Sequence, residues 1–178
     1  MKEGDVLFLA GSIPASMPDD IYSRIMKELK DKGIMIVVDA TRDLLMNVLE
    51  YRPFLIKPNN HELGEIFGVE LKDRQSVIPY GKKLQGMGAV NVLISMAGEG
   101  AVLIAADGQS MGAPAPKGTL VNGVGAGDSM VAGFLTGWME KKDYVHAFHM
   151  GIAAGSASAF SEYLATRPEV EEVYKQLV

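Results

Sequence analysis

Asn122-Gly-Val-Gly-Ala-Gly-Asp-Ser129 is a glycine-rich turn that opens directly into a helical pattern over 129–140. Its glycines allow backbone N–H groups to converge, and a helix N-terminus adds about half a positive charge. Such a turn would hold a phosphoryl group. The chain also changes character here. Strands alternating with helices are predicted before this loop, and helices alone after it, so the sequence predicts an α/β fold.

Short apolar runs before the loop predict the strands of a mainly parallel sheet. Each run is almost continuously apolar, as is typical of strands buried on both faces. Helical patterns separate the runs, and parallel neighbours need long crossovers of this kind. The predicted strands cover 6–10, 34–38, 54–57 and 92–95.

Helices are predicted between these strands. The first is expected to begin at a Ser16 cap and to end before Gly33. The second follows Asp43 and continues through Leu49, and the third lies near 76–86. A hairpin is predicted after the last parallel strand, with Asp-Gly as its turn; its strands cover 101–105 and 109–112.

Helices alone are predicted in the C-terminal part, over 126–140, 144–163 and 168–178. The middle helix is rich in Gly, Ala and Ser between 151 and 158, so its backbone can be approached closely. Either a neighbouring helix or a flat ligand such as a nucleobase would account for this, and the two are compatible.

Composition limits the classes of protein to consider. With 178 residues, of which 48% are hydrophobic, the chain fits a single domain over 1–178. A net charge of -5 argues against nucleic acid as a partner. The absence of cysteine excludes disulfides and thiolate metal sites, and together with the lack of a signal-peptide pattern it favours the cytoplasm. No apolar run is long enough to span a bilayer, so no membrane association is expected.

Asp128 places a negatively charged side chain beside a turn that would bind an anion, and two explanations are possible. It would serve as a simple helix cap. Alternatively, its carboxylate would accept a proton from an attacking hydroxyl while the loop amides stabilise the charge on a transferred phosphoryl group. The P-loop and dinucleotide-binding patterns are both excluded, because the glycine spacing here is G-x-G-x-G and no G-x-x-x-x-G-K-[ST] occurs.

Two further segments follow predicted strands, where open α/β sheets place their ligands. In the first, Lys57 would reach a nucleotide phosphate, and Asn59 and Glu62 would share a helix face and hold hydrated Mg²⁺. The alternative is a Pro-Asn turn with Glu62 favourably placed at the helix dipole. The second segment, 95–100, lies where phosphate or ribose would bind.

Taken together, four motifs resemble the pfkB carbohydrate kinases, the ribokinase-like family. Their order and spacing match as well, and the resemblance covers essentially the whole chain. The run AAGSASAFSE resembles the branch that phosphorylates fructose 1-phosphate or tagatose 6-phosphate. The motifs are GVGAGDSMVAGF (123–134), IKPNNHE (56–62), SMAGEGA (95–101) and LAGSIPASMP (9–18).

The resemblance implies a role for each matching position. It makes Asp128 the catalytic base and makes Gly125, Ala126 and Gly127 the anion hole. It implies ATP and Mg²⁺ as cofactors, with a monovalent cation as a further possibility, and Glu62 and Asn59 at the metal. Gly11 and Ser12 match a segment near the sugar. The positions implied at the nucleotide are Lys57, Asn59, Ser95, Gly98, Gly100, Ala154 and Ser158.

The resemblance also implies a ribokinase-like three-layer αβα fold whose N-terminal half and lid are missing from this chain. The expected function is transfer of phosphate from ATP to the C6 hydroxyl of fructose 1-phosphate. Alternatives are tagatose 6-phosphate as substrate, or a catalytically inert nucleotide-binding fragment. The missing half would leave an exposed sheet edge near 6–10, so poor activity and self-association are expected of the chain alone.

Overall fold

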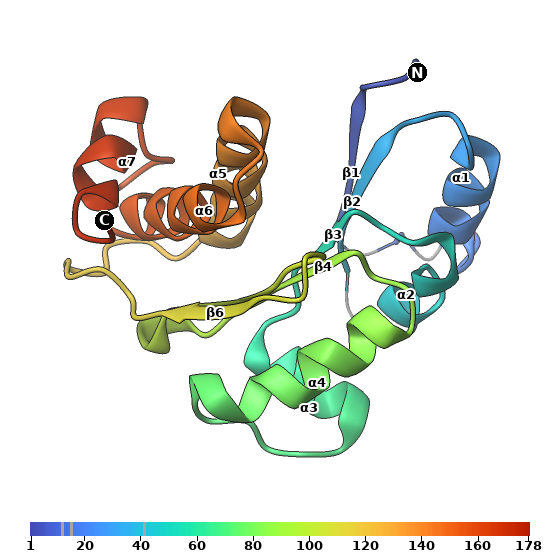
Figure 1. Ribbon diagram of the computed structural model, residues 1–178, viewed down its shortest axis with the longest axis horizontal. Coiled ribbons are helices and arrows are strands. Elements are labelled where there is room, and N and C mark those ends of the chain that lie inside the picture. Colours follow the sequence, from blue (N-terminus) through green and yellow to red (C-terminus); the bar gives the residue numbers. More distant parts are fainter. Residues whose placement is uncertain (12, 15, 41) are drawn as a thin grey trace. The chain divides into compact units, whose positions relative to one another are not determined.

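The computed structural model describes residues 1–178 except 12, 15 and 41, and its described strands form one sheet in the order β1-β2-β3-β4-β5-β6 (Figure 1). The pairs β1–β2, β2–β3 and β3–β4 are parallel. The predicted α/β class and mainly parallel sheet are therefore confirmed. The strands are β1 (Val6–Ala10), β2 (Met35–Asp39), β3 (Leu55–Ile56), β4 (Asn91–Ser95), β5 (Ala101–Ile104) and β6 (Ser110–Ala113).

The expected hairpin is present as β5 and β6. The two strands are neighbours in the sheet, and a connection of this length joins only antiparallel strands. The Ala105 N–H donates to Gln109 O at 2.9 Å and the Gly108 N–H donates to Ala105 O at 3.0 Å, which closes the turn. Asp107-Gly108 therefore forms the turn that the sequence predicts.

Two compact units make up the chain, and each is described here by itself. The first comprises Met1–Met96 and Val102–Ser110, and the second comprises Ala97–Ala101 and Met111–Val178. Within the described part of the chain, no helix is long and apolar enough to cross a membrane.

The core of the first unit lies between the sheet and helices that follow its strands. Every second strand residue, such as Val38, Ile56, Val92 and Ile94, packs into one apolar cluster with helix residues such as Leu63. The intervening strand residues are buried as well. The side chains of Val37, Leu55, Leu93 and Leu103 are all 0% exposed. Burial on both faces, which the continuous apolar runs predict, is confirmed for β2, β3 and β4, whereas it is wrong for β1, where only Leu9 is buried.

Helix α1 (Ile21–Leu29) begins later than predicted. Its N-cap is Asp20, so the predicted Ser16 cap is wrong. The residue before a proline is driven away from the helical region, so Met17 before Pro18 cannot belong to the helix. Two turns precede the helix instead, closed by the hydrogen bonds Met17 N to Pro14 O and Ile21 N to Pro18 O.

The predicted second helix is split. Helix α2 (Arg42–Met46) ends early, and a separate 3-10 turn, η1, covers Leu49–Tyr51. Pro53 prevents this turn from extending, and Arg52 before it has a left-handed φ of 55°. The third predicted helix is α4 (Arg74–Gly86), which a capping box at Asp73 begins.

The second unit consists mainly of helices α5 (Ala126–Lys141), α6 (Tyr144–Ala159) and α7 (Arg167–Tyr174). Small residues let α5 and α6 pack backbone to backbone. A Cβ on Gly133 would lie 2.4 Å from Met150 O and 2.6 Å from Ala154 Cβ, and a Cβ on Gly155 would lie 3.0 Å from Ala126 O. A neighbouring helix therefore accounts for the small residues of α6.

Candidate functional site

The glycine loop is held in shape by its own backbone and by one side chain. Gly125, the N-cap of α5, has a φ of 78°, and a Cβ there would lie 2.7 Å from Leu164 Cδ2. Both the left-handed backbone and the neighbour therefore favour glycine. Asn122 Oδ1 accepts the Val124 N–H at 3.0 Å, which folds the chain into the turn.

Asp128 lies in the first turn of α5 as its third residue, and its side chain is exposed. The cap position belongs to Gly125, which has no side chain, so the alternative that Asp128 caps the helix is wrong. The carboxylate is thus placed beside the helix N-terminus without serving as its cap.

The N–H groups of the first helical turn have no acceptor within the helix. In α5 these groups belong to Ala126, Gly127 and Asp128, and Gly125 precedes them as the cap. The Ala126 N–H donates to Gly123 O of the loop at 3.3 Å. The first regular helical bond runs from Ser129 N to Gly125 O at 2.8 Å. Chemically, the turn offers converging donors for an anion together with a carboxylate that can accept a proton.

Lys57 lies directly after β3, and its side chain is 8% exposed. Its Nζ lies 3.1 Å from Asp39 Oδ2 at the end of the neighbouring strand β2, where the Asp39 side chain is 20% exposed. A buried ammonium group needs such a partner. Asp39 was not among the predicted site residues, because in the sequence it only follows the apolar run 34–38; its place opposite Lys57 follows from the strand register.

Asn59 and Glu62 form a reciprocal capping box at α3 (Asn60–Phe67). Asn59 Oδ1 accepts the Glu62 N–H at 2.8 Å, and Glu62 Oε2 accepts the Asn59 N–H at 2.8 Å. The two side chains therefore lie on one side of the helix start, as predicted. They also perform the structural role that was the alternative to metal binding.

A hydrated Mg²⁺ ion fits this donor set. The two side chains present amide and carboxylate oxygens, and Mg²⁺ is often held by one or two protein carboxylates plus waters and substrate phosphates. Among the described residues no group of three or more His, Asp or Glu side chains is arranged to enclose a metal ion. With one carboxylate and one amide, the donor set suits an ion that keeps most of its waters.

Ser95 ends β4 and lies beside Asn59. The two residues form an isolated parallel bridge, and Ser95 N donates to Pro58 O at 3.2 Å. Gly98 lies in the exposed 3-10 turn η2 (Ala97–Glu99) with open space around it. Position 100 requires glycine for structural reasons, because its φ is 92° and a Cβ there would lie 2.0 Å from Ala113 O.

Gly11 lies at the end of β1, in the same unit as Lys57. Its N–H donates to Asp39 O at 3.0 Å, and Tyr22 Oη donates to Ala10 O at 2.9 Å and lies 3.3 Å from Gly11 O. The pKa of Tyr22 is raised by burial and by the nearby charge of Asp39. Ser12, the other residue expected near the sugar, lies outside the described residues.

Ala154 and Ser158 lie on α6, in the same unit as the glycine loop. Ala154 packs against Gly133 of α5, and Ser158 is 3% exposed. Ser158 Oγ donates to Ser129 Oγ at 2.9 Å and accepts the Ala165 N–H at 3.1 Å. The implied contact of these two residues with a nucleotide stays a prediction.

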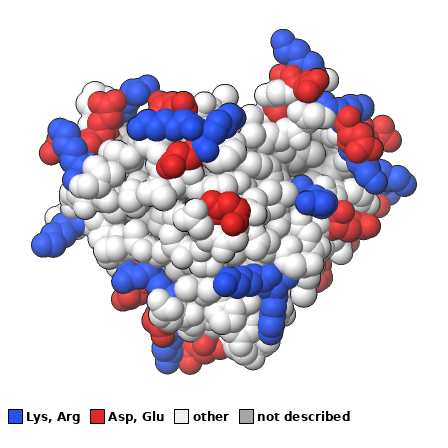
Figure 2. All heavy atoms as spheres, viewed as in Figure 1, with Lys and Arg blue, Asp and Glu red and all other residues white. Residues whose placement is uncertain are grey.

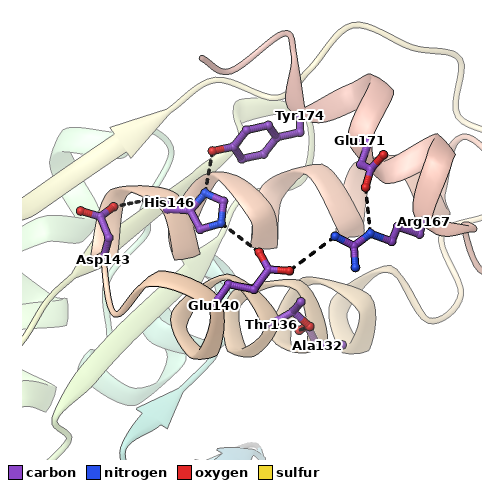
Figure 3. Close-up of polar contacts among 8 residues, drawn as sticks. All are labelled: Ala132, Thr136, Glu140, Asp143, His146, Arg167, Glu171 and Tyr174. Carbon is purple, nitrogen blue, oxygen red and sulfur yellow. Dashed lines mark hydrogen bonds and ion pairs between the residues drawn. The ribbon is translucent and has the colours of Figure 1, made fainter.

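A polar cluster links the three helices of the second unit away from the loop. His146 lies between Glu140 Oε2 at 3.2 Å and Tyr174 Oη at 2.8 Å, and Arg167 lies 3.6 Å from Glu140 Oε1 (Figure 3). Because a carboxylate only accepts, Nε2 donates to Glu140, while Nδ1 is hydrogen-bonded to the Tyr174 hydroxyl. This arrangement ties α7 to α5 and α6.

Charged side chains of both signs intermingle on the face shown in Figure 2, with no large area of basic residues there. The site residues form two groups. Gly11, Lys57, Asn59, Glu62 and Ser95 lie in the first unit, and Gly98, Gly100, the glycine loop, Asp128, Ala154 and Ser158 lie in the second.

Comparison with known proteins gives one consistent family. Residues 1–170 match the profile of the pfkB family carbohydrate kinases. The chain belongs to the pfkB family. The chain is 45% identical over 177 residues to the 1-phosphofructokinase of Bacillus subtilis, covering 99% of this chain and 58% of that protein. It is 33% identical over 178 residues to the D-tagatose-1-phosphate kinase of Klebsiella oxytoca, with coverage of 99% and 58%.

A solved pfkB-like structure agrees. The crystal structure of Escherichia coli phosphofructokinase-2 in complex with substrates and products matches with a TM-score of 0.91 and 25% identity, covering 99% of this chain and 58% of that one. The expected family is therefore confirmed. This pfkB chain spans about 58% of the length of the relatives it matches, in agreement with the expectation that such kinases contain a further region.

Proposed function

We propose that this chain carries the nucleotide-binding and catalytic part of an ATP-dependent sugar-phosphate kinase. The observation that supports this most directly is the first turn of α5, where the exposed carboxylate of Asp128 lies beside the cap Gly125 and the N–H groups that have no acceptor within the helix. The pfkB match over residues 1–170 supports the same reaction class.

In the proposed step, Asp128 accepts the proton of the substrate hydroxyl. The hydroxyl oxygen forms a bond to the γ-phosphorus of ATP as the bond from that phosphorus to the bridging oxygen breaks, and ADP leaves. The N–H groups of Gly125, Ala126 and Gly127 stabilise the negative charge on the transferred group. Each of these roles needs only groups that the glycine loop presents.

The nucleotide is assigned to residues after β3 and β4 and to α6. In this proposal Lys57 binds a phosphate of ATP. The nucleoside is lined by Ser95, Gly98, Gly100 and Ala154. Glu62 and Asn59 are to hold hydrated Mg²⁺, which neutralises phosphate charge when bound. Their capping box keeps both side chains at the start of α3 and therefore preorganises them.

Fructose 1-phosphate is the proposed acceptor, phosphorylated at the C6 hydroxyl to give fructose 1,6-bisphosphate, with Gly11 near the sugar. The relative at 45% identity is a 1-phosphofructokinase, which favours this substrate. D-Tagatose 1-phosphate replaces the tagatose 6-phosphate expected from the sequence as the second candidate, because a D-tagatose-1-phosphate kinase is 33% identical to the chain. It differs from fructose 1-phosphate at one carbon and carries the same free C6 hydroxyl.

Self-association is proposed as well. Strand β1 is the first in the sheet order, and Val6, Leu7 and Phe8 are only partly buried. Edge strands with apolar side chains invite pairing with another chain. Light scattering of the purified chain that shows only monomer at high concentration would contradict this.

Transfer of labelled phosphate from ATP tests the function. The chain is incubated with Mg-ATP and either fructose 1-phosphate or tagatose 1-phosphate, beside an Asp128→Asn variant. We expect slow transfer to fructose 1-phosphate, in keeping with the poor activity expected of the chain alone, and the variant should lower this rate by about 10²-fold to 10⁴-fold, the usual contribution of a general base. A variant with nearly normal turnover would refute the role of Asp128, and Mg-ATP binding without transfer would favour an inert nucleotide-binding fragment.

A further inference from the structure

The last turn of α6 and the segment after it contact the glycine loop at several points. Ala159 O accepts the N–H groups of Val121 and Asn122 at 2.9 and 3.1 Å, just before the loop. Asn122 Nδ2 donates to Glu162 O at 3.3 Å. Gly155 approaches the first residue of α5, since a Cβ there would lie 3.0 Å from Ala126 O. The shape of the loop therefore depends on α6.

Ser158 is the buried polar residue among these contacts. Its hydroxyl donates to Ser129 Oγ at 2.9 Å, and Ser129 directly follows Asp128. The same hydroxyl accepts the backbone N–H of Ala165 at 3.1 Å. A buried hydroxyl is stable only when it is hydrogen-bonded, and this one joins α5 to the segment after α6.

A second path leads from Ser158 to the loop. The Ala165 N–H that it accepts belongs to the residue after Leu164. Leu164 in turn contacts Gly125, because its Cδ2 lies 2.7 Å from where a Gly125 Cβ would be. Loss of the Ser158 hydroxyl would release both contacts of the first turn of α5, one through Ser129 and one through Leu164.

We propose that Ser158 is a positioning residue, which fixes the glycine loop and Asp128 by joining Ser129 Oγ to the N–H of Ala165. Its hydroxyl is engaged inside the protein, so it acts on the loop through these neighbours. The importance of this role rests on the proposed phosphoryl transfer at Asp128. The bridge itself is a property of the folded chain and is testable without turnover.

Amide hydrogen exchange of the full chain, followed by NMR without ligand, tests the bridge. In Ser158→Ala we expect the amides of Ala165 and Ser129 to exchange about tenfold faster, because Ala165 loses its acceptor and the first turn of α5 opens more often. Thr136→Val is the matched control, since it removes a hydroxyl of α5 that bonds only to Ala132 O within the same helix. The control should leave both amides unchanged.

Ser129→Ala and Ser129→Thr show whether the effect passes through Ser129. This position is partly exposed, so both variants should fold even if Ser158→Ala does not. Ser129→Ala should speed exchange in the first turn of α5, and Ser129→Thr, which keeps the hydroxyl, should restore it. In the double variant the two alanine effects should be less than additive. Additive effects, or normal exchange at Ser129 in Ser158→Ala, would overturn the proposal.

A final measurement separates this proposal from the proposed function. Mg-ATP is titrated into the wild type, Ser158→Ala and Thr136→Val. If both proposals hold, Ser158→Ala weakens binding about fivefold to tenfold and the control does not. If the wild type neither binds Mg-ATP nor transfers phosphate, the proposed function fails, and the exchange data alone decide on the bridge. Normal Mg-ATP affinity and normal turnover in Ser158→Ala would refute its positioning role.

Discussion

Replacing Gly133 by alanine should have two opposing effects on stability: a gain in helix propensity and a loss of packing between α5 and α6. Position 133 lies inside α5, where alanine is favoured over glycine by about 1 kcal/mol. The new Cβ would lie 2.4 Å from Met150 O and 2.6 Å from Ala154 Cβ, whereas ordinary contact begins at 3.4 Å. A backbone carbonyl of a packed helix cannot move aside alone, so α5 and α6 must separate.

The packing loss should exceed the propensity gain. Overpacking of a tight core costs about 1 to 3 kcal/mol, and the upper part of this range applies here because the obstacle is backbone. The net loss in the free energy of unfolding is then about 1 to 2 kcal/mol. For a chain of this size that lowers the melting temperature by about 2 to 8 °C.

Trp138 is a suitable probe, because it is the only tryptophan and lies on α5, stacked on Tyr144 with ring centroids 4.5 Å apart. Its fluorescence during thermal unfolding therefore reports on the α5–α6 pair. Gly86→Ala is the matched control, since Gly86 is also helical and a Cβ there meets nothing within 4 Å. The control should be neutral or stabilising. A higher melting temperature for Gly133→Ala would refute the packing argument.

Three other changes test the Lys57 ion pair, the capping box of α3 and the partly buried His149 of α6. Asp39→Asn should lower the free energy of unfolding by about 1 to 3 kcal/mol in urea, because it leaves the Lys57 ammonium without its charged partner; equal stability would contradict this. Glu62→Gln keeps the shape of the capping box and removes its charge, so Mg-ATP affinity should fall while the melting temperature changes little. Burial lowers the pKa of His149 below its usual 6.5, so the unfolded state binds more protons and stability should fall as pH drops below about 6.5. His149→Asn should flatten this part of the stability curve, and an unchanged slope would rule His149 out as its cause.

Strands and most helices were predictable because each leaves a local pattern. Continuous apolar runs identified the strands, and Asp107-Gly108 identified the hairpin turn. The start of α1 was not predicted correctly, since Ser16 resembles a cap while Pro18 forbids a helix through Met17. The split between α2 and η1 was not predicted either. Leu45 and Leu49 are spaced four residues apart, which fits one continuous helix as well as a helix followed by a 3-10 turn.

Site residues were predictable only where a motif carries the chemistry. The glycine loop and Asp128 are adjacent in sequence, so their relation is visible there. The Lys57–Asp39 pair joins two strands, and the bridge from Ser158 to Ser129 spans two helices, so both depend on packing that sequence spacing does not show. The resemblance implies that Ser158 lies near the nucleotide, and only the structure reveals its hydrogen bonds to Ser129 and Ala165.

Calorimetric titration of the purified chain with Mg-ATP tests the central claim most directly, because all the residues proposed to bind the nucleotide lie in this chain. We expect saturable binding that Asp128→Asn leaves largely intact, since a base acts on the acceptor hydroxyl, and that Lys57→Ala weakens. A folded wild-type sample that gives no binding heat at any temperature tried, and no change in amide exchange of the glycine loop, would contradict the claim that this chain carries the nucleotide site.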